Sequence, residues 1–523
     1  GTNHPRMLTA LEKAKRNGAK IITANPIQEA GLISFSNPQK VSGFLGGATN
    51  LTDLYLQVKI NSDTALLKAI MWELLKQEEE APGTAIDLDF IKQRTEGYED
   101  FMQGIKSQDP QQLADLCGVP LGDIKQAAEL IRSRPKMIVC WAMGLTQHQN
   151  AVDTIKEVVN LLLLRGSIGK PGAGSCPVRG HSNVQGDRTM GIWEKPPQWF
   201  LDKLNQVFKF DPPTEVGYDT VESIQAMHQG KAKVFVGLGG NFHSATPDTD
   251  YTSQALQNCS MTVQISTKLN RSHLVTGKTA FILPCLARTD IDRQLAGEQI
   301  VSVENSMGVV HQSRGVLDPI SDELKSEPEI IACLANAVLG VDWDHLIDDY
   351  DAIRNLIQQV VPGFDDYNNR LRQPGGFYLP NVARSGKFKR GKATFSLIPL
   401  PEHQLQEDEY LMMTIRSHDQ FNTTIYGKDD RYRGIINERR VILMNPEDME
   451  EAGLKAKEVV SITSCYQGVT RQVDCFKVVP YSIPRKNVAT YFPEANPLVP
   501  VHLIAKKSQT PCSKSVIVRV ITS

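Results

Sequence analysis

Short apolar runs that alternate with helix-like runs constrain the fold of this chain more than any other feature. The runs AKIITANP (19–26), MIVCWAMG (137–144) and KVFVGLGGN (233–241) predict short strands, and stretches with helical apolar spacing lie between them. Such alternation is typical of an α/β fold with a doubly wound, Rossmann-like parallel sheet. From about residue 410, short β-rich runs separated by turns replace it and predict an all-β, barrel-like unit.

These changes of pattern predict four parts, because 523 residues are too many for one hydrophobic core. We expect a Rossmann-like α/β domain over 1–186, a second α/β domain over 187–340, a linker or crossing segment over 341–405, and a C-terminal β-barrel domain over 406–523. The linker expectation depends on a stretch rich in Pro, Gly and Lys, LRQPGGFYLPNVARSGKFKRGKATF.

Charge, hydropathy and cysteine usage exclude several classes of function. The formal net charge is −2 and no basic stripe is visible, which argues against nucleic-acid binding. No apolar run approaches the roughly 18 residues that a membrane span needs. The nine cysteines include no CxxC pair, so we expect reduced thiols, no iron–sulfur ligand run and a cytoplasmic location. The start, GTNHPR, lacks Met and resembles a turn between a strand and a helix, so we expect a fragment.

A Gly-rich stretch, LRGSIGKPGAGSCPVRGHSNVQGDRTMG (164–191), is the strongest local candidate for a binding site. Its glycines allow close approach of a ligand, and its Arg, Asn and Gln side chains offer many hydrogen-bonding groups. This combination suits a large, flat ligand that carries phosphates. The alternative is a long surface loop, since many Gly-rich segments are only loops.

The chain resembles the molybdopterin-dependent oxidoreductases, in the branch with formate dehydrogenase α subunits and their relatives (the FdhF-YdeP-like branch). The resemblance lies in the Gly-rich stretch and in a series of motifs along nearly the whole chain: AKIITANP, WAMGLTQHQNAV, STKLNRSHLVTG, VENSMGVVHQSRG, RSHDQFNTTIYG, ILMNPEDMEEAGL, YFPEANPLVP and SQTPCSKSVIVRV. It implies molybdenum or tungsten held by two pterin guanine dinucleotides, a bis-(molybdopterin guanine dinucleotide) cofactor. It also implies cofactor contacts at strand ends in the α/β domains and in the C-terminal domain.

The resemblance assigns roles to individual residues. Arg179 matches the arginine that lies beside the metal in formate dehydrogenases, where its fork of donors can pair with a carboxylate. His181 could relay protons or hydrogen-bond a pterin, and both roles stay open. The expected cofactor contacts are Asn3, His4, Asn25, Gln147, Gly180, Gln185, Gly240, Asn241, Asp248, Ser266, Lys268, Arg416, Ser417, Gln420, Asn422, Asn496 and Lys514. For Arg179 the alternative is a structural role, and Asn305 and Ser306 are expected to cap a turn.

Two departures from the family pattern shape the functional expectation. The usual N-terminal part, which carries the metal ligand and any 4Fe-4S cluster, is absent, so we expect no metal ligand in this chain. His181 and Ser182 replace the Gln-Asn of formate dehydrogenases, which leaves formate open as a substrate. We expect a formate dehydrogenase-like molybdopterin oxidoreductase that acts on a small anionic substrate and pairs with an electron-transfer protein. The alternative is a catalytically incomplete cofactor-binding fragment.

Overall fold

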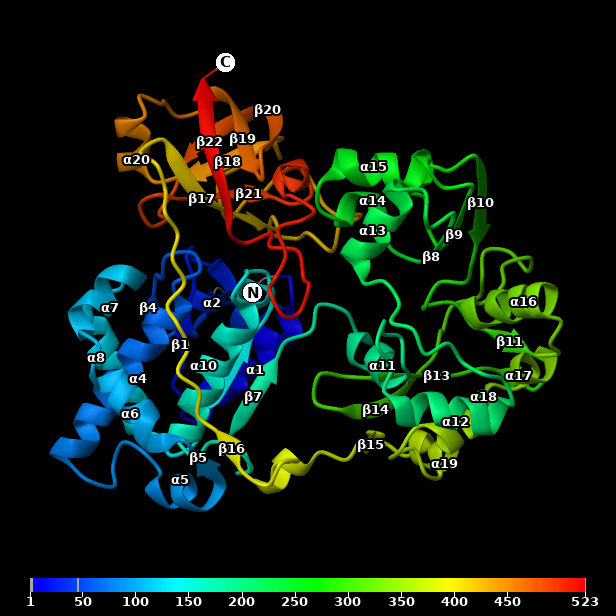
Figure 1. Ribbon diagram of the computed structural model, residues 1–523, viewed down its shortest axis with the longest axis horizontal. Coiled ribbons are helices and arrows are strands. Elements are labelled where there is room, and N and C mark those ends of the chain that lie inside the picture. The colour runs from blue at the N-terminus through cyan, green and yellow to red at the C-terminus, as the bar shows by residue number, and fades with distance from the viewer. Residues whose placement is uncertain (1–2, 45–46, 523) are drawn as a thin grey trace. The chain divides into compact units, whose positions relative to one another are not determined.

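The computed structural model describes residues 3–44 and 47–522, and the chain divides into two compact units (Figure 1). Each unit is assembled from separate stretches of chain. Unit 1 comprises Gly1–Ser175, Ser244–Thr249 and Val382–Ser523, and unit 2 comprises Cys176–His243 and Asp250–Asn381.

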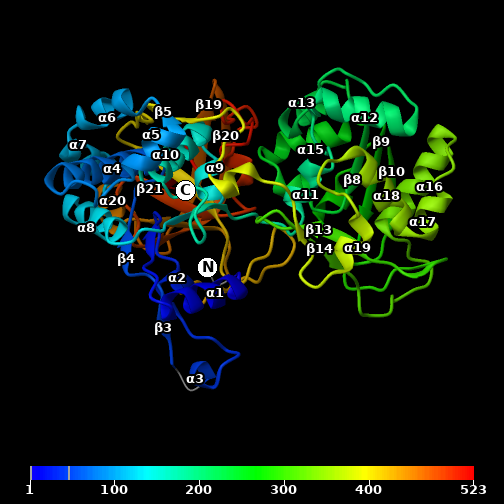
Figure 2. The same ribbon diagram turned by 90° about the horizontal axis from the view of Figure 1, so that it is seen from below.

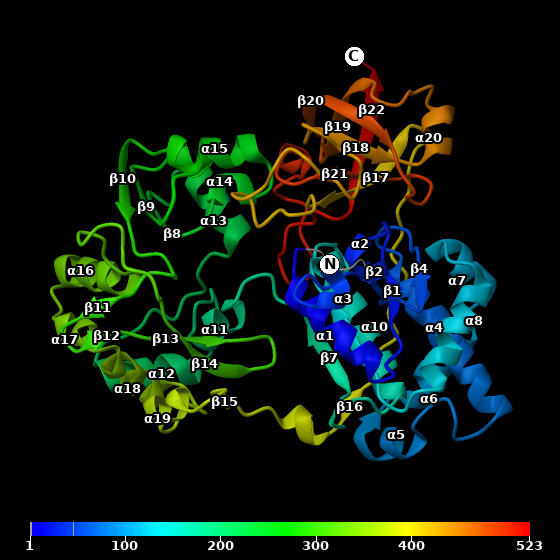
Figure 3. The ribbon, with the colours of Figure 1, turned by 180° about the vertical axis from the view of Figure 1, so that it is seen from behind.

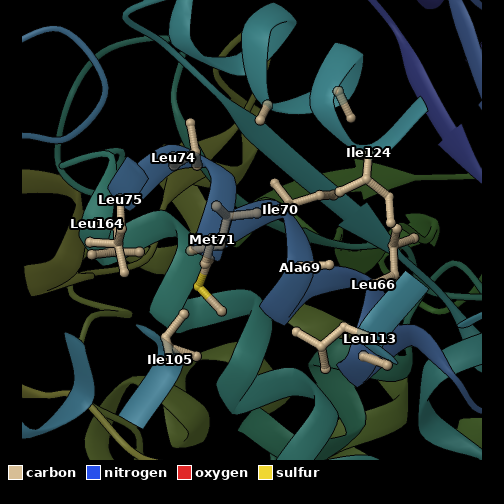
Figure 4. Close-up of a cluster of buried hydrophobic side chains, with 14 of the residues drawn as sticks. Leu66, Ala69, Ile70, Met71, Leu74, Leu75, Ile105, Leu113, Ile124 and Leu164 are labelled. Carbon is tan, nitrogen blue, oxygen red and sulfur yellow. The ribbon is translucent and has the colours of Figure 1, made fainter. Parts of the chain in front are cut away.

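Helix α4 (Asp63–Glu80) forms the centre of the α/β part of unit 1. Most of its side chains are buried, because four other helices pack around it. Figure 4 shows Met71 pointing toward Ile105 and Ile70 pointing toward Ile124 within this core. A helix surrounded in this way must be apolar on nearly all sides. The surrounding helices are α6 (Tyr98–Lys106), α7 (Pro110–Cys117), α8 (Leu121–Arg132) and α10 (Ala151–Leu164).

The N-terminal segment of unit 1 adds a small parallel pairing and a projecting extension. Strand β1 (Ile22–Ala24) pairs in parallel with β4 (Leu54–Leu56). The extension holds β2 (Ser34–Phe35), α3 (Val41–Phe44) and β3 (Thr49–Asn50), and Figure 2 shows it beyond the rest of the unit. The other elements are α1 (Pro5–Arg16), α2 (Ala30–Ile33), α5 (Leu88–Arg94), α9 (Met143–Thr146), β5 (Thr95–Glu96), β6 (Ile138–Trp141), β7 (Gly174–Pro177) and β16 (Ala393–Thr394).

The C-terminal part of unit 1 is a closed six-stranded barrel in the order β17-β21-β18-β20-β19-β22 (Figure 3). Met412 faces the barrel core, whereas its neighbours Leu411 and Met413 pack with Ile27 and Ile60 of the α/β part. Strand β17 is buried on both faces, and its residues 410–413, YLMM, are accordingly apolar without a break. The elements are β17 (Glu409–Ile415), β18 (Val441–Met444), α20 (Pro446–Glu451), β19 (Val459–Tyr466), β20 (Val469–Pro480), β21 (Asn487–Tyr491) and β22 (Val516–Thr522).

A parallel three-stranded sheet in the order β10-β9-β8 forms the α/β part of unit 2. The central strand carries the apolar burial, since Val263 and Ile265 lie in the core. The elements are α11 (Val184–Thr189), α12 (Gln198–Phe208), α13 (Thr220–His228), β8 (Val234–Leu238), β9 (Met261–Ser266) and β10 (Thr279–Pro284). Helices α14 (Phe242–Ala245) and α15 (Thr249–Gln257) each have residues in both units.

An antiparallel sheet and a group of helices complete unit 2. The hairpin of β13 (Val301–Glu304) and β14 (Val309–Ser313) extends to β15 (Phe377–Tyr378). Val310 packs with Phe364 and Tyr367, and the Tyr367 hydroxyl donates to Ser302 Oγ at 2.6 Å. The other elements are β11 (Arg293–Gln294), β12 (Gly297–Glu298), α16 (Glu327–Leu339), α17 (Asp344–Asp348), α18 (Tyr350–Val360) and α19 (Tyr367–Arg372).

The observed architecture confirms the expected fold class, because α/β regions precede a closed β-barrel. The division of the chain differs from the expected boundaries. Residues 344–372 form three helices of unit 2, whereas a linker was expected over 341–405. Ile353, Leu356, Ile357 and Val360 have helical spacing in α18, and this period was missed in a stretch of mixed composition. The chain also leaves unit 1 after Ser175, earlier than the boundary expected at 186.

Candidate functional site

In the first half of the Gly-rich stretch, Gly169 packs closely against another part of the protein. Gly169 has φ +81°, and a Cβ there would lie 2.2 Å from the backbone nitrogen of Gly386. The absence of a side chain at Gly169 therefore lets the backbone at Gly386, also in unit 1, approach closely.

The second half of the stretch lines a cavity within unit 2. The cavity has a volume of about 280 Å³ and opens to solvent. Its walls come from the segment before α11, from the loop after β10 and from the β13–β14 hairpin. The lining residues are Arg179, Gly180, His181, Ser182, Arg288, Val303, Asn305, Ser306 and His311. Arg179, Gly180 and His181, all singled out from the sequence, are one continuous segment of this lining.

Arg179 is held at this cavity by two neutral partners. Its backbone N–H donates to Ser306 Oγ at 3.3 Å, and its Nη2 donates to Gln185 Oε1 at 3.1 Å. Gln185, expected to contact the cofactor, therefore orients the arginine from α11. The exposed guanidinium keeps most of its donors for a ligand.

The turn between β13 and β14 supplies the opposite wall. Asn305 Oδ1 accepts from the backbone N–H groups of Met307 at 2.9 Å and Val309 at 3.2 Å. Asn305 thus caps the turn, as expected, while Ser306 holds the backbone of Arg179. His311, on β14, directs its Nδ1 to the carbonyl of Gln312 at 3.3 Å.

Sequence reasoning missed Arg288, which reaches the same cavity from the loop after β10. Its Nη1 donates to Ser182 Oγ at 3.2 Å, and its Nη2 donates to Ser313 Oγ at 3.1 Å. A usable signal existed, because Arg288 follows the carboxyl end of a parallel strand, where open α/β sheets bind ligands.

Glu304 lies directly behind the cavity wall and is buried. Its carboxylate accepts from Thr189 Oγ1 at 2.6 Å, and its backbone N–H donates to Asn183 Oδ1 at 3.0 Å. Burial raises the pKa of Glu304 despite the hydrogen bond from Thr189. These bonds attach α11 to β13 and so fix the two walls that carry Arg179 and Ser306.

A second group of expected residues gathers in unit 1, around the start of α1 and the 416–420 segment. Asn3 Nδ2 donates to the carbonyl of Gln420 at 2.7 Å, and the backbone N–H of Asp419 donates to Asn3 Oδ1 at 2.9 Å. Residues from opposite ends of the chain are therefore neighbours here. Ser417 and Gln420 are buried beside them.

The side chains of Ser417 and Gln420 form hydrogen bonds with other residues of unit 1. Gln420 Oε1 accepts from the Ser417 backbone N–H at 3.0 Å and from Arg439 Nη2 at 3.1 Å, while its Nε2 donates to the Phe492 carbonyl at 2.7 Å. Ser417 Oγ accepts from Arg439 Nη1 at 2.7 Å. Gln420 Nε2 also donates to the carbonyl of Asn422, whose side chain is exposed.

Three basic side chains lie near this segment and carry lowered pKa values. Burial lowers the pKa of Lys514 to about 8, and the charge of Arg416 adds to the shift. Burial and the Arg416 charge also lower the pKa of His4, and burial lowers that of Arg416 itself. Neither Arg416 nor Lys514 forms an ion pair with another residue that the structure describes. This concentration of positive charge suits an anionic ligand.

Asn25 and Gln147 lie after the strands that led us to select them. Asn25 Nδ2 donates to the carbonyl of Ile27 at 2.8 Å, so it closes a local turn. The Gln147 carbonyl accepts from the Lys514 backbone N–H at 3.2 Å, which joins the end of α9 to the basic group. Next to it, His148 is a buried core histidine that bonds to Ser515 Oγ at 3.0 Å.

The expected contacts in unit 2 lie at the carboxyl ends of β8 and β9. The Gly240 carbonyl accepts from Asn270 Nδ2 at 2.8 Å, and Asn241 Oδ1 accepts from Ser272 Oγ at 2.9 Å. Ser266 Oγ donates to the carbonyl of Lys268, whose side chain is exposed. Because the two parallel strands are neighbours, these residues share one sheet edge.

Asp248 and Asn496 hold the 244–249 segment to the barrel part of unit 1. Asp248 Oδ2 lies 2.6 Å from Arg471 Nη2 in a buried ion pair. Asn496 Nδ2 donates to the carbonyls of Ser244 at 2.7 Å and Thr246 at 3.2 Å. Both residues thus bond within the protein, and their cofactor contacts stay a prediction.

Within residues 3–44 and 47–522, no three His, Cys, Asp or Glu side chains are grouped as metal ligands would be. In the same part of the chain, no helix combines the length and apolar character needed to cross a membrane.

Two family models match this chain. Residues 1–273 match the model described as molybdopterin oxidoreductase, and residues 410–517 match that of the molydopterin dinucleotide binding domain. Together they include the N-terminal and C-terminal stretches that make up most of unit 1, along with part of unit 2.

Several known proteins are similar over nearly the whole chain. An uncharacterized oxidoreductase of Mycobacterium bovis is 50% identical over 531 residues, which cover 99% of this chain and 68% of the relative. Protein YdeP of Escherichia coli is 41% identical over 98% of this chain and 69% of its own length. The α subunit of an F420-dependent formate dehydrogenase from Methanocaldococcus jannaschii is 24% identical over 95% of this chain and 71% of its own length.

A solved structure supports the fold alone. Acetylene hydratase from Pelobacter acetylenicus superposes with a TM-score of 0.66 at 14% sequence identity. The match covers 99% of this chain and 76% of that structure.

Proposed function

The chain belongs to the molybdopterin oxidoreductase family, and on that premise we propose that it serves two-electron redox chemistry on a small anionic substrate. The bound group is a molybdenum or tungsten bis-(molybdopterin guanine dinucleotide), which supplies the electron-transfer chemistry. The observation that carries the proposal is the cavity that Arg179 and His181 both line.

The donor set of unit 1 fits an anionic dinucleotide. Arg416 and Lys514 bring positive charge to the 416–420 segment without an ion-pair partner among the described residues, and His4 lies near them. Diphosphate groups are recognised by such cations and by backbone N–H groups. We assign His4, Arg416 and Lys514 to the cofactor. The strand-end residues Gly240, Asn241, Ser266 and Lys268 of unit 2 remain proposed contacts.

Arg179 is the proposed substrate ligand. Its fork binds a carboxylate or another oxyanion through parallel hydrogen bonds, while Gln185 and Ser306 keep it in place. Similarity to a formate dehydrogenase α subunit supports a formate-like substrate. Oxidation of formate would release carbon dioxide, one proton and two electrons.

His181 is the proposed proton carrier or pterin partner. It is exposed at the cavity, and an imidazole can both accept and donate a proton. The two roles differ in outcome: loss of a proton carrier lowers kcat, whereas loss of a pterin contact lowers the cofactor content.

The first experiment measures metal and pterin content of the intact protein, made in a host that synthesises the cofactor. We expect about one molybdenum or tungsten with two pterins, and turnover of formate or a small oxyanion with an artificial electron acceptor or donor. Arg179→Gln removes charge-assisted hydrogen bonds worth about 1.5–3 kcal/mol each, so kcat/KM should fall about 100-fold or more. The control is Arg293→Gln, which changes an exposed arginine paired with Asp318 outside the cavity.

Three results would contradict this proposal. Absence of pterin from the intact protein would show that the family's cofactor function is lost. Loading of the intact protein but not of this chain would favour the alternative, an incomplete cofactor-binding fragment. Equal kcat/KM in the Arg179→Gln variant would remove Arg179 from the substrate site.

A cytoplasmic location, a 4Fe-4S relay and an electron-transfer partner protein belong to the same proposal for the intact protein.

A further inference from the structure

We propose that the substrate is a doubly charged oxyanion, because Arg288 brings a second guanidinium into the cavity that holds Arg179. This inference rests on the proposed function and names its substrate class. It goes beyond the family resemblance, which pointed to one arginine and to formate.

Both arginines are positioned by neutral oxygens. Arg288 bonds to the hydroxyls of Ser182 and Ser313, and Arg179 bonds to the amide oxygen of Gln185. Neither guanidinium forms an ion pair with any residue that the structure describes. Each side chain is therefore oriented while its charge stays uncompensated, which is the arrangement of a site made to receive an anion.

The rest of the lining increases this positive character. His181 and His311 also line the cavity, and no Asp or Glu does so among the described residues. The nearest strand carboxylate, Glu304, is buried on the other side of β13 and is bonded to Thr189. Two like charges that share one cavity repel each other, and a ligand with two negative charges relieves that repulsion best.

The size of the cavity agrees with a ligand larger than formate. Formate has one carboxylate, which one arginine fork can satisfy. The volume of about 280 Å³ is several times the ~30 Å³ that one water occupies in the liquid. A dianion with charged oxygens on two sides can engage Arg179 and Arg288 together.

Hydrogen bonds and close packing hold the loop that carries Arg288. The Ala287 backbone N–H donates to Asp290 Oδ2 at 2.8 Å, and the carbonyl of Thr289 accepts from the backbone N–H groups of Val316 and Leu317. Gly315 makes this packing possible, since a Cβ there would lie 1.8 Å from the Asp290 carbonyl oxygen. The guanidinium of Arg288 is thus directed by a fixed turn.

The test measures anion binding to the oxidised, cofactor-loaded intact protein by isothermal titration calorimetry. The probes are oxalate and sulfate as dianions, and formate and nitrate as monoanions. We expect at least one dianion to bind about tenfold more tightly than either monoanion. Tighter binding of oxalate would identify a dicarboxylate substrate, and tighter binding of sulfate a tetrahedral oxyanion.

Variants separate the role of Arg288 from a general effect of charge. Arg288→Gln should abolish the preference for the dianion, because a single guanidinium, that of Arg179, then remains in the cavity. Arg293→Gln removes the same charge outside the cavity and should leave the preference intact. The inference is overturned if Arg288→Gln keeps the wild-type preference, or if formate binds as tightly as both dianions. Unchanged melting temperature of each variant shows that the fold is retained.

The same data distinguish failure of this inference from failure of the proposed function. Turnover of formate together with equal binding of all four anions would retain the enzyme and reject the dianion. Preference for a dianion that depends on Arg288, in protein that lacks metal and pterin, would retain the anion site and reject the redox function.

Discussion

His418 Nδ1 lies 2.7 Å from Oδ1 of Asp430, and both side chains are buried in unit 1. The other carboxylate oxygen of Asp430 accepts from Arg433 Nη1 at 2.8 Å and from the Tyr491 hydroxyl at 2.7 Å. Arg433 also reaches Glu29 Oε1 at 3.1 Å, just before α2. This buried ionic network joins the α/β part of unit 1 to its barrel.

Stability should depend on pH through His418. Burial opposes its charge, but the bonds to Asp430 and Glu29 outweigh burial and raise its pKa. A raised pKa in the folded state stabilises the protein below the unfolded value of about 6.5, and this contribution is lost as pH rises through the folded value. We expect the melting temperature of the chain to fall from about pH 6 upward.

The variant His418→Gln tests this origin of the pH dependence. It should be less stable than wild type near pH 6 and should lose most of the decline above that value. His345→Gln, at an exposed histidine of α17, is the matched control and should keep the decline. A decline that persists unchanged in His418→Gln would assign the pH dependence to other groups.

A second buried pair, Lys68 of α4 and Glu157 of α10, should show how a lone buried charge destabilises the fold. Lys68 Nζ lies 3.0 Å from Glu157 Oε1, and both side chains are almost fully buried. Burial raises the pKa of Glu157. Lys68→Met leaves a buried carboxyl without its cation and should lower the unfolding free energy by about 3–5 kcal/mol.

The double variant Lys68→Met/Glu157→Leu should recover most of that loss, because both charges are then replaced by apolar groups. Chemical denaturation of the single and double variants measures the difference. Equal stability of the two would show that lost packing, not the unpaired charge, determines the effect.

Gly315→Ala should displace the turn that carries Arg288. The added Cβ would lie 1.8 Å from the Asp290 carbonyl oxygen, so backbone must move, and overpacking of this kind destabilises by about 1–3 kcal/mol. We also expect weaker binding of dianions. Gly217→Ala in the same unit is the control, because its Cβ would meet Glu194 at an ordinary 3.6 Å. Unchanged anion binding in Gly315→Ala would separate Arg288 from this turn.

Lys514→Met should change stability and cofactor binding in opposite directions. The pKa of Lys514, lowered to about 8 mainly by burial, means that the folded chain disfavours the charged form. The sign is opposite to that of His418: this penalty is present below about pH 8 and disappears as pH rises toward the unfolded value of about 10.4. Without cofactor, the variant should therefore melt higher than wild type at neutral pH.

In protein purified from a cofactor-producing host, Lys514→Met should retain several-fold less pterin, measured by fluorescence after oxidation. Lys506→Met, at an exposed lysine in the same C-terminal segment, should retain the wild-type amount. Wild-type pterin content in Lys514→Met would remove this lysine from the cofactor site.

Local pattern was sufficient for the fold class and for the family. The apolar period of the runs around 19–26 and 233–241 comes from the local backbone, and it is visible without tertiary contacts. The change to β-rich runs near 410 likewise predicted the barrel. The period of α18 was visible too, but neighbouring Pro and Gly residues obscured it, so three helices were read as a linker.

Composition could not show which polar side chains form hydrogen bonds or ion pairs within the protein. Gln420 and Asp248 have the same residue types as ligand contacts, yet Arg439 and Arg471 take their oxygens. These partners are distant in sequence, so pairing depends on how the barrel closes and where the 244–249 segment lies within unit 1.

The sequence by itself determined the strand–helix order and the barrel, because both depend on local periodicity, and a motif in it singled out Arg179. Only the tertiary structure decided that Arg288 shares the cavity with Arg179. That meeting requires the turn after β10 to pack against the chain at Gly315, and it requires the β13–β14 hairpin to face α11. Long-range packing of this kind leaves no periodic trace in the sequence, because the residues that meet are far apart along the chain.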